Sequence, residues 1–257
     1  QFVYVFVSLI GYGLLFWCIR KYSENFAVSI VLFFSIGYFY LLGLNQIRQF
    51  IALVIVFYAL SLIPNGKFLT YAILVGVASL FHFTALIMFP CYFIFKLKPK
   101  LSYFFVLIVA LVPFNLFYTE IMQFLFSTFR PAYVGSAYME RQASVDIIGL
   151  IPLIAVLLIL LFYYDKIVKT NPMNLIAFNG VLISVIIMSV CSWIPEYKRF
   201  IYYFYLPMIY VVPNILQLEQ KKSVRYLLFG AIIVLSLIPV LRSAPGWGVY
   251  PYSSTLF

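Results

Sequence analysis

Long apolar runs alternate with short polar connectors over the whole chain. The runs lie at about residues 1–19, 26–44, 47–63, 68–95, 101–119, 147–164, 172–193, 200–216 and 225–241. Most of them match the roughly 17–25 residues with which an α-helix crosses a hydrocarbon layer. In lipid a helix satisfies its own backbone groups, whereas a membrane barrel needs alternating strands of about ten residues, which the sequence lacks. The pattern therefore predicts an all-α, polytopic transmembrane bundle that forms a single domain over residues 1–257.

The run at 68–95 is longer than the others and has His82 at its middle. We interpret it as two half-helices, FLTYAILVGVASLF and HFTALIMFPCYFIF, that meet at His82. Each would be about 21 Å long at 1.5 Å per residue, too short to cross a membrane. A re-entrant hairpin would then return the chain to the side that it left. A single long tilted helix is the alternative.

The positive charges favour the hairpin. If every run crosses once, the two sides carry eight and nine Lys and Arg residues, which sets no orientation. With a hairpin at His82, eleven lie on one side, which becomes the cytoplasmic side, and six on the other. The six outer cations are Arg48, Arg130, Arg141, Lys198, Arg199 and Arg242. We therefore predict about eight spans, plus a broken or re-entrant helix around His82.

Composition supports a membrane protein and limits its partners. Charged residues make up 9% of the chain and the mean hydropathy is +1.08, whereas a soluble domain has about a quarter charged residues. The net charge of +10 sits in clusters between apolar runs, which suits topology signals and anionic lipid or phosphate and argues against nucleic acid. The chain opens at Gln1 inside an apolar run, so we expect it to be truncated at the N-terminus.

Arg48 is the first candidate for chemistry. Asn45, Arg48, Gln49 and Ala52 stand at i, i+3, i+4 and i+7, the spacing of one polar helix face. A charge inside the membrane costs about 2.5–3.5 kcal/mol, so this face should look into the bundle. A guanidinium matches phosphate oxygens with two hydrogen bonds, which predicts a phosphate site. The alternative is a helix-end arginine that reaches the headgroups or pairs with a carboxylate.

His82 is the only histidine of the chain. A neutral imidazole can act as a base or an acid near pH 7. If a helix restarts here, free N–H groups and the positive end of its dipole also face a ligand, and Thr84 is placed to cap that start. A histidine that is hydrogen-bonded between helices is the alternative.

The stretch EYKRFIYYFY supplies a second cationic site. Glu196 and Arg199 are i, i+3 partners on a helix, and Tyr202 and Tyr203 follow. This pattern suits a second phosphate clamp with aromatic surfaces for sugars. A cationic-aromatic belt at the membrane interface is the alternative, and we favour it for Lys198.

The connector at 120–146 is the longest, and we predict an external loop there. Arg130 and Arg141 on this loop are candidates for substrate contacts, and a solvated amphipathic helix is the alternative. The seven carboxylates form no D-x-D pair, and no H-E-x-x-H, Walker A or G-x-S-x-G motif occurs. We therefore expect no metal site and no cofactor.

Several short motifs share their order and spacing with one family. They comprise Arg48, Gln49 and Ala52, then Ala78, Phe81, His82, Thr84 and Ala85, then Arg199, Tyr202 and Tyr203, and last Pro251 and Tyr252. On these residues the chain resembles the EpsG-like family of exopolysaccharide and O-antigen polymerases, which are related in function to Wzy. The resemblance covers nearly the whole chain.

The resemblance implies a multi-pass protein of the bacterial cytoplasmic membrane. It implies metal-independent glycosyl transfer between undecaprenyl-diphosphate-linked oligosaccharides on the outer face, next to membrane lipid, a flippase and a chain-length regulator. On this hypothesis Arg48 and Arg199 hold the donor diphosphate, and His82 deprotonates the acceptor hydroxyl or hydrogen-bonds the phosphate. Two rival functions remain open: a transporter or flippase of a lipid-linked anionic glycan, and a membrane O-acyltransferase.

Overall fold

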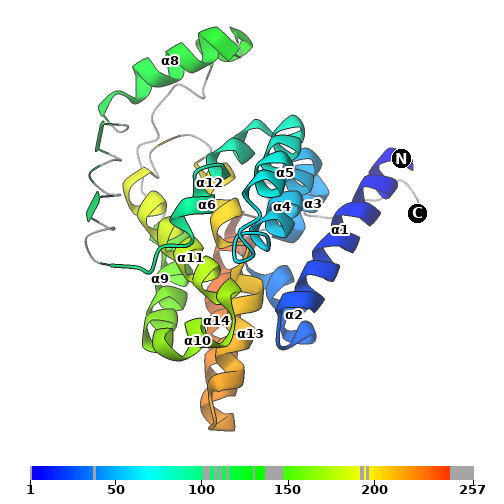
Figure 1. Ribbon diagram of the computed structural model, residues 1–257, viewed down its shortest axis with the longest axis vertical. Coiled ribbons are helices and arrows are strands. Elements are labelled where there is room, and N and C mark those ends of the chain that lie inside the picture. The colour runs from blue at the N-terminus through cyan, green and yellow to red at the C-terminus, as the bar shows by residue number, and fades with distance from the viewer. Residues whose placement is uncertain are drawn as a thin grey trace.

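The computed structural model describes residues 2–36, 39–100, 105–106, 109, 112–113, 116–129, 131–136, 147–191, 194 and 197–243. These residues form helices and turns without a strand, so the prediction of an all-α fold is confirmed for them (Figure 1). The helices are α1 (Phe2–Tyr22), α2 (Phe26–Ser35), α3 (Phe39–Asn45), α4 (Ile47–Leu60), α5 (Phe68–Phe81), η1 (Phe83–Met88), α6 (Cys91–Ile94), α8 (Tyr118–Phe129), η2 (Pro131–Tyr133), α9 (Ile147–Phe162), α10 (Tyr164–Thr170), α11 (Pro172–Cys191), α12 (Lys198–Tyr205), α13 (Met208–Leu218) and α14 (Lys222–Ser243).

Helices α11, α12 and α13 form the core of the bundle. Most side chains of α12 and α13 are buried, whereas α14 is mostly exposed. Gly180 of α11 packs against the backbone of α12, where a β-carbon added to the glycine would lie only 2.0 Å from the carbonyl oxygen of Phe204. The missing side chain therefore lets α12 approach α11 closely, and this sets the position of the helix that carries Arg199.

The described part of the chain holds three helices long and apolar enough to cross a membrane, at Pro172–Cys191, Lys198–Leu218 and Lys222–Arg242. The number rises to five if α2 with α3 and α9 with α10, bent by 63° and 81°, each count as one span. The prediction of about eight spans is therefore not confirmed. The apolar runs are divided by bends and turns that hydropathy alone does not report, and α4 and α5 have only 14 residues each.

The predicted break at His82 is confirmed. Helix α5 ends at Phe81, and His82 has an extended backbone with φ −148° and ψ 112°. The chain then folds back along α5, because the hydroxyl of Tyr71 donates to the backbone oxygen of Met88 at 2.5 Å. Rings at the two ends of this segment also meet, with 5.0 Å between the centroids of Phe68 and Tyr92. The segment is a hairpin, so the alternative of one long tilted helix is wrong.

The second half of the hairpin differs from the predicted half-helix. It consists of the 3-10 helix η1 and the four-residue α6, separated by a turn at Pro90. Proline lacks the N–H group that would continue an α-helical hydrogen-bond ladder, which accounts for the interruption.

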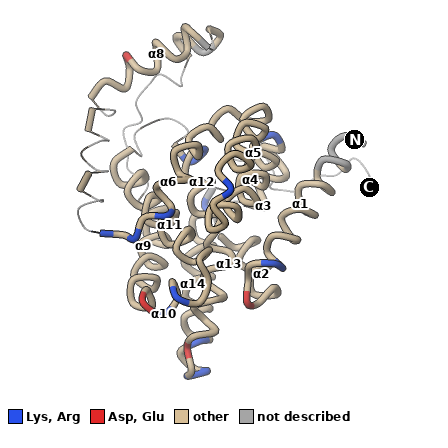
Figure 2. Tube along the Cα trace, viewed as in Figure 1, with Lys and Arg blue, Asp and Glu red and all other residues tan. Residues whose placement is uncertain are grey.

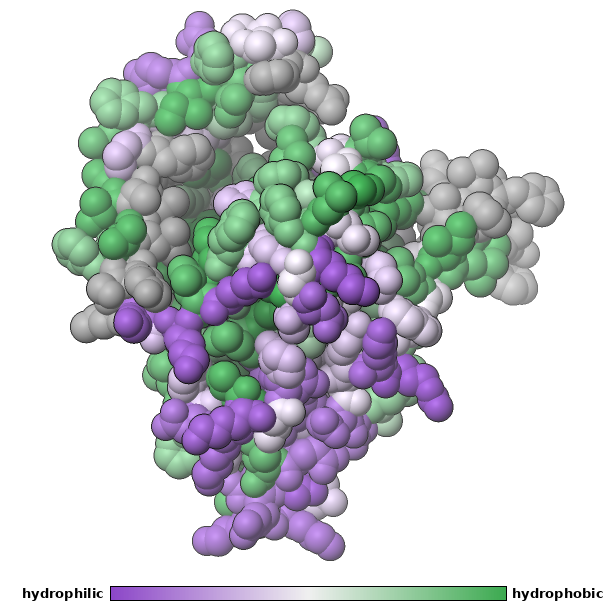
Figure 3. Space-filling view, viewed as in Figure 1, coloured by the Kyte–Doolittle hydropathy of each residue, from purple (hydrophilic) through white to green (hydrophobic). Residues whose placement is uncertain are grey.

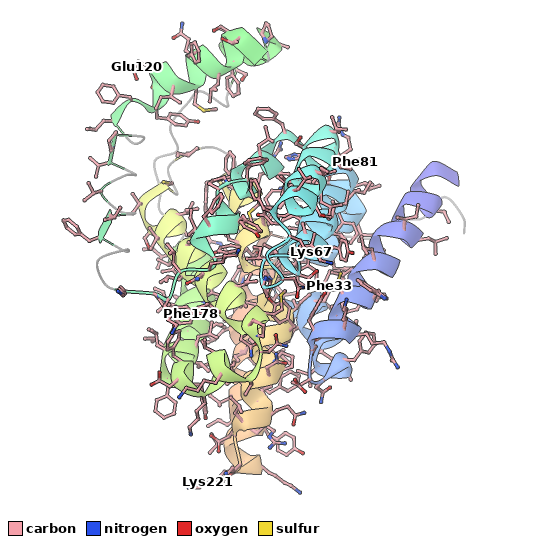
Figure 4. All side chains as sticks on the ribbon, viewed as in Figure 1. Phe33, Lys67, Phe81, Glu120, Phe178 and Lys221 are labelled. Carbon is pink, nitrogen blue, oxygen red and sulfur yellow. The ribbon has the colours of Figure 1, made fainter. Side chains whose placement is uncertain are left out.

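Residues 118–129 form α8, so the first part of the predicted loop at 120–146 is helical. Figure 1 shows α8 apart from the bundle, at the end away from the start of α14. Its acidic residue Glu120 is labelled in Figure 4. Arg130 and Arg141 lie beyond this helix and outside the described residues, so the alternative of a solvated helix at these two arginines stays a prediction.

The ends of the bundle differ in polarity. Figure 3 shows hydrophilic residues gathered over the lower part of the visible face and a more hydrophobic upper part. Charges of both signs lie around α10 and at the lower end of α14 (Figure 2). Phe81, directly before the break at His82, lies toward the upper end, whereas Lys221 lies at the lower end (Figure 4). The break is thus far from Lys221, one of the cations predicted on the cytoplasmic side.

Candidate functional site

Three segments that the sequence singled out converge in the structure. Helix α12 packs against both α4 and η1, and α4 also packs against η1. A direct hydrogen bond joins the first turns of α4 and α12, since Nε2 of Gln49 donates to the backbone oxygen of Arg199 at 2.9 Å. The segments that carry Arg48, His82 and Arg199 therefore lie together, although 150 positions separate Gln49 from Arg199.

Arg48 and Gln49 point to different environments. Arg48 is exposed, and within the described residues its guanidinium makes no hydrogen bond or ion pair. Gln49 is buried, with 1% of its surface exposed. Arg48 is thus able to meet a ligand, while Gln49 holds α4 to α12.

The predicted polar face of Asn45, Arg48, Gln49 and Ala52 is wrong. Asn45 ends α3, and Gln46 interrupts the helix with φ −114° and ψ 57° before α4 begins. Asn45 and Arg48 are exposed, whereas Gln49 and Ala52 are buried. The i, i+3, i+4 spacing assumed a continuous helix, and the break at Gln46 changes the direction of the chain between Asn45 and Arg48.

His82 is part of a hydrogen-bonded row of side chains. Its Nδ1 atom lies 2.6 Å from Oγ1 of Thr84, which in turn lies 3.3 Å from the hydroxyl of Tyr203. Tyr203 is buried on α12, so the row links the break in the hairpin to the core of the bundle. The predicted capping role of Thr84 is wrong, because η1 has no side-chain cap and the Thr84 hydroxyl contacts the imidazole instead.

The neighbouring residues Tyr202 and Tyr203 lie on different sides of α12. Tyr203 contacts Thr84 of η1, whereas Tyr202 lines a cavity between α9, α11, α12 and α14. Neighbouring residues of an α-helix are about 100° apart around the axis, which accounts for the separation. Tyr202 and Tyr203 therefore do not form one aromatic surface beside Arg199.

Lys198 lines the same cavity as Tyr202 and is half-buried. The sequence pattern favours an interfacial belt for Lys198 and so misses this position. The usable signal is the i, i+4 spacing of Lys198 and Tyr202, which places both on one helix face. Thr84, considered only as a cap, is the second residue whose position was missed.

Three predicted site residues, Arg130, Arg141 and Glu196, lie outside the described residues. The expected pair of Glu196 with Arg199 therefore stays a prediction. Arg199 itself is half-buried at the first turn of α12. Within the ranges that the structure describes, no group of three or more His, Cys, Asp or Glu side chains is placed to hold a metal ion.

The first turns of α4 and α12 suit an anion. Neither helix has a side-chain hydrogen bond at its N-cap, at Gln46 or at Tyr197. The N-terminal end of a helix carries a partial positive charge, and Arg48 and Arg199 each add a full charge in the first turn. The arrangement can therefore concentrate positive potential at the joined ends of two helices.

Comparison with known proteins supports the assignment made from the motifs. The model of the EpsG family matches residues 1–254. No curated protein and no solved structure matches the chain. The resemblance drawn from the short motifs is thus confirmed at the level of the family.

Proposed function

Because the chain belongs to the EpsG family, we propose that it joins undecaprenyl-diphosphate-linked oligosaccharide repeats into exopolysaccharide or O-antigen on the outer face of the bacterial cytoplasmic membrane. Family membership and the apolar helices support a membrane protein with a polysaccharide-polymerase-like function. The observation that carries the finer proposal is the hydrogen bond from Gln49 to the backbone of Arg199. It brings the first turns of α4 and α12, each with an arginine, to one place beside the hairpin of His82.

Arg48 and Arg199 hold the donor diphosphate in this proposal. The acceptor hydroxyl oxygen forms a bond to the anomeric carbon of the donor, and the bond from that carbon to the diphosphate breaks. The leaving diphosphate gains negative charge, which preorganised cations and helix N-termini stabilise. Arginine suits this role because its planar fork donates two parallel hydrogen bonds to phosphate oxygens. The chemistry assigned to these residues is glycosyl transfer without a metal.

His82 either accepts the proton of the attacking hydroxyl or donates a hydrogen bond to the phosphate. The direction of its hydrogen bond with Thr84 sets the tautomer of the ring and so decides between these two roles. If Nδ1–H donates to Thr84, then Nε2 is an acceptor and can take the proton of the attacking hydroxyl. If the Thr84 hydroxyl donates to Nδ1, then Nε2 carries the proton and donates to a phosphate oxygen. The contact with Thr84 therefore positions the ring for either role, and the pH dependence of the rate distinguishes them.

The proposal is tested by polymer length in cells that carry Arg48→Ala, Arg199→Ala or His82→Ala at wild-type membrane levels. We expect each variant to lose long polymer. Arg20→Ala is the matched control, because Arg20 is an exposed arginine in the last turn of α1 and should leave the polymer unchanged. Long polymer in all three site variants would remove the assignment.

A defined reaction separates the proposal from its rivals. Purified protein is mixed with a lipid-linked repeat of known structure, and the products are weighed by mass spectrometry with and without a chelator. A ladder of whole repeats in both samples supports a metal-independent polymerase. Transfer between leaflets without a new glycosidic bond would indicate a transporter, and an acylated glycan would indicate an O-acyltransferase.

A further inference from the structure

A cavity lies on the side of α12 that carries Tyr202. It is small and partly open, with a volume of about 50 Å³, several times the roughly 10–15 Å³ that one water molecule needs. The lining residues come from α9, α11, α12, α13 and α14 and from the end of α2: Ile36, Gly149, Pro152, Leu153, Met188, Lys198, Ile201, Tyr202, Tyr205, Met208, Ser236 and Pro239. The cavity therefore lies between helices that are far apart in the sequence.

The lining has the chemistry of a site for an amphiphile. Eight of its twelve residues have no side-chain nitrogen or oxygen, so most of the surface offers only apolar contact. Lys198 is half-buried, which places a cation where the cavity meets the surface. A sugar needs several hydrogen-bonding partners around it, whereas a hydrocarbon chain with one anionic end needs a surface of this kind.

Ser236 adds an independent observation. Its side chain is 3% exposed, and its hydroxyl oxygen is buried without a hydrogen-bond partner among the described residues. A buried hydroxyl without a partner has lost its hydrogen bonds to water without replacement, and Ser236 lines the cavity. A ligand with an oxygen acceptor would satisfy this hydroxyl.

The cavity and the site already described share helix α12. Lys198 precedes Arg199 in the first turn of α12, so the cation of the cavity lies one residue from the arginine assigned to the diphosphate. The helices that bound the cavity also present exposed apolar residues outward, such as Ile151 on α9 and Ile238 on α14. A chain that leaves the cavity between these helices would therefore enter the acyl region of a bilayer.

We propose that this cavity binds the first isoprene unit of the polyprenyl diphosphate substrate, with Lys198 and Ser236 directed to its phosphate end. The inference rests on the proposed function, because it names the place of the lipid portion of the same substrate. It gives the two basic residues of the first turn of α12 related roles, with Arg199 at the diphosphate and Lys198 where the diphosphate joins the lipid chain.

A binding measurement with two probes tests the inference. The protein in phosphatidylglycerol nanodiscs is titrated with undecaprenyl diphosphate and, separately, with inorganic diphosphate. Leu153→Trp fills the cavity, since Leu153 lines it and is 5% exposed. We expect undecaprenyl diphosphate to bind at least about tenfold more weakly to this variant, the effect of excluding about two methylene groups, with inorganic diphosphate unaffected. Leu158→Trp is the matched control, because Leu158 lies on the same helix, is 61% exposed and should bind both probes as the wild type does.

Photolabelling of the wild-type chain keeps the test independent of the folding of a variant. A polyprenyl diphosphate with a diazirine in its first isoprene unit should label peptides of α9 and α14, and excess undecaprenyl diphosphate should suppress the labelling. Labelling confined to helices that do not line the cavity, or suppression by excess phosphatidylglycerol as well, would overturn the inference, as would wild-type affinity in Leu153→Trp. Persistence of long polymer in the Arg48, Arg199 and His82 variants would instead overturn the proposed function, so the two failures are distinct.

Discussion

Gly180→Ala tests whether the position of α12 controls the site. A β-carbon at this position would lie 2.0 Å from the backbone oxygen of Phe204, whereas ordinary van der Waals contact begins at 3.4 Å. The difference, 3.4 Å minus 2.0 Å, means that α12 and α11 must separate by about 1.4 Å. A side chain could swing away, but the atom that is struck belongs to the backbone of a helix, so the whole of α12 must move.

The expected loss of stability follows from two opposed terms. Overpacking of a core costs about 1–3 kcal/mol. We expect a cost near 3 kcal/mol for Gly180→Ala, because the added carbon meets the backbone oxygen of Phe204 and not a movable side chain. Alanine is favoured over glycine inside a helix by about 1 kcal/mol, which leaves a net destabilisation of about 2 kcal/mol. For a chain of this size that corresponds to a fall of about 4–8 °C in the unfolding temperature.

The expected loss of activity is larger than the loss of stability. Helix α12 carries Arg199 in its first turn and Tyr203 in contact with Thr84, so a shift of α12 displaces both from their partners. A misplacement of about 1 Å can reduce a rate about a hundredfold. We therefore expect Gly180→Ala to produce at most short products from the lipid-linked repeat, even at a temperature where it is folded.

Two other glycines provide controls for the same substitution. At Gly76 on α5 the added carbon would meet no atom of the described residues within 4 Å beyond its own stretch of helix, so Gly76→Ala should raise the unfolding temperature slightly and leave the product ladder unchanged. At Gly43 the obstacle is the hydroxyl of Tyr12, at 2.1 Å, which is the end of a side chain and has no hydrogen-bond partner among the described residues. Gly43→Ala should therefore fall between the other two. Equal unfolding temperatures and equal product ladders for Gly180→Ala and Gly76→Ala would refute the reasoning.

Three further predictions concern hydrogen bonds. Thr84→Val keeps the shape of the side chain but removes the hydroxyl that contacts His82 Nδ1, so it should slow polymerisation about tenfold and shift the pH profile of the rate. Tyr203→Phe should have a smaller effect. Unchanged pH profiles in both variants would count against a role for the contacts between His82, Thr84 and Tyr203. Asn214→Leu leaves the buried Oδ1 of Asn174 and the part-buried N–H of Glu24 without partners and should lower the free energy of unfolding by about 1–3 kcal/mol in denaturant melts. The hydrogen bond from Tyr163 lowers the pKa of Glu219 below its usual 4.5, so the stability it adds is complete above pH 4.5 and is lost as the pH falls through the lowered value. The difference in unfolding temperature between wild type and Tyr163→Phe should accordingly shrink in acid, and a constant difference would contradict this.

Much of the local structure was predictable from the sequence. Apolar runs without strand alternation led to helices, and the excess length of the run at 68–95 with His82 at its middle led to the hairpin. These features depend on residues close together in the chain, because helix formation and the satisfaction of backbone groups are local. The order of the short motifs likewise led to the family that the whole-chain match confirms.

The number of spans and the faces of the helices were not predictable in the same way. The break at Gln46 separates Asn45 from Arg48 and removes the expected polar face, and the i, i+3 spacing of these two residues alone does not show it. Hydropathy measures how apolar a run is, whereas a bend depends on what the helix packs against. A regular spacing therefore predicts a shared face only where the helix is unbroken.

The sequence by itself determined that this protein is a helical bundle interrupted at His82, with arginines at the starts of two helices. The tertiary structure alone decided that Gln49 reaches the backbone of Arg199, that Thr84 joins His82 to Tyr203, and that Tyr202 turns toward a cavity with Lys198. The reason is physical: local pattern sets which residues become helical, whereas contacts between distant helices depend on close approaches such as that of Gly180 to Phe204.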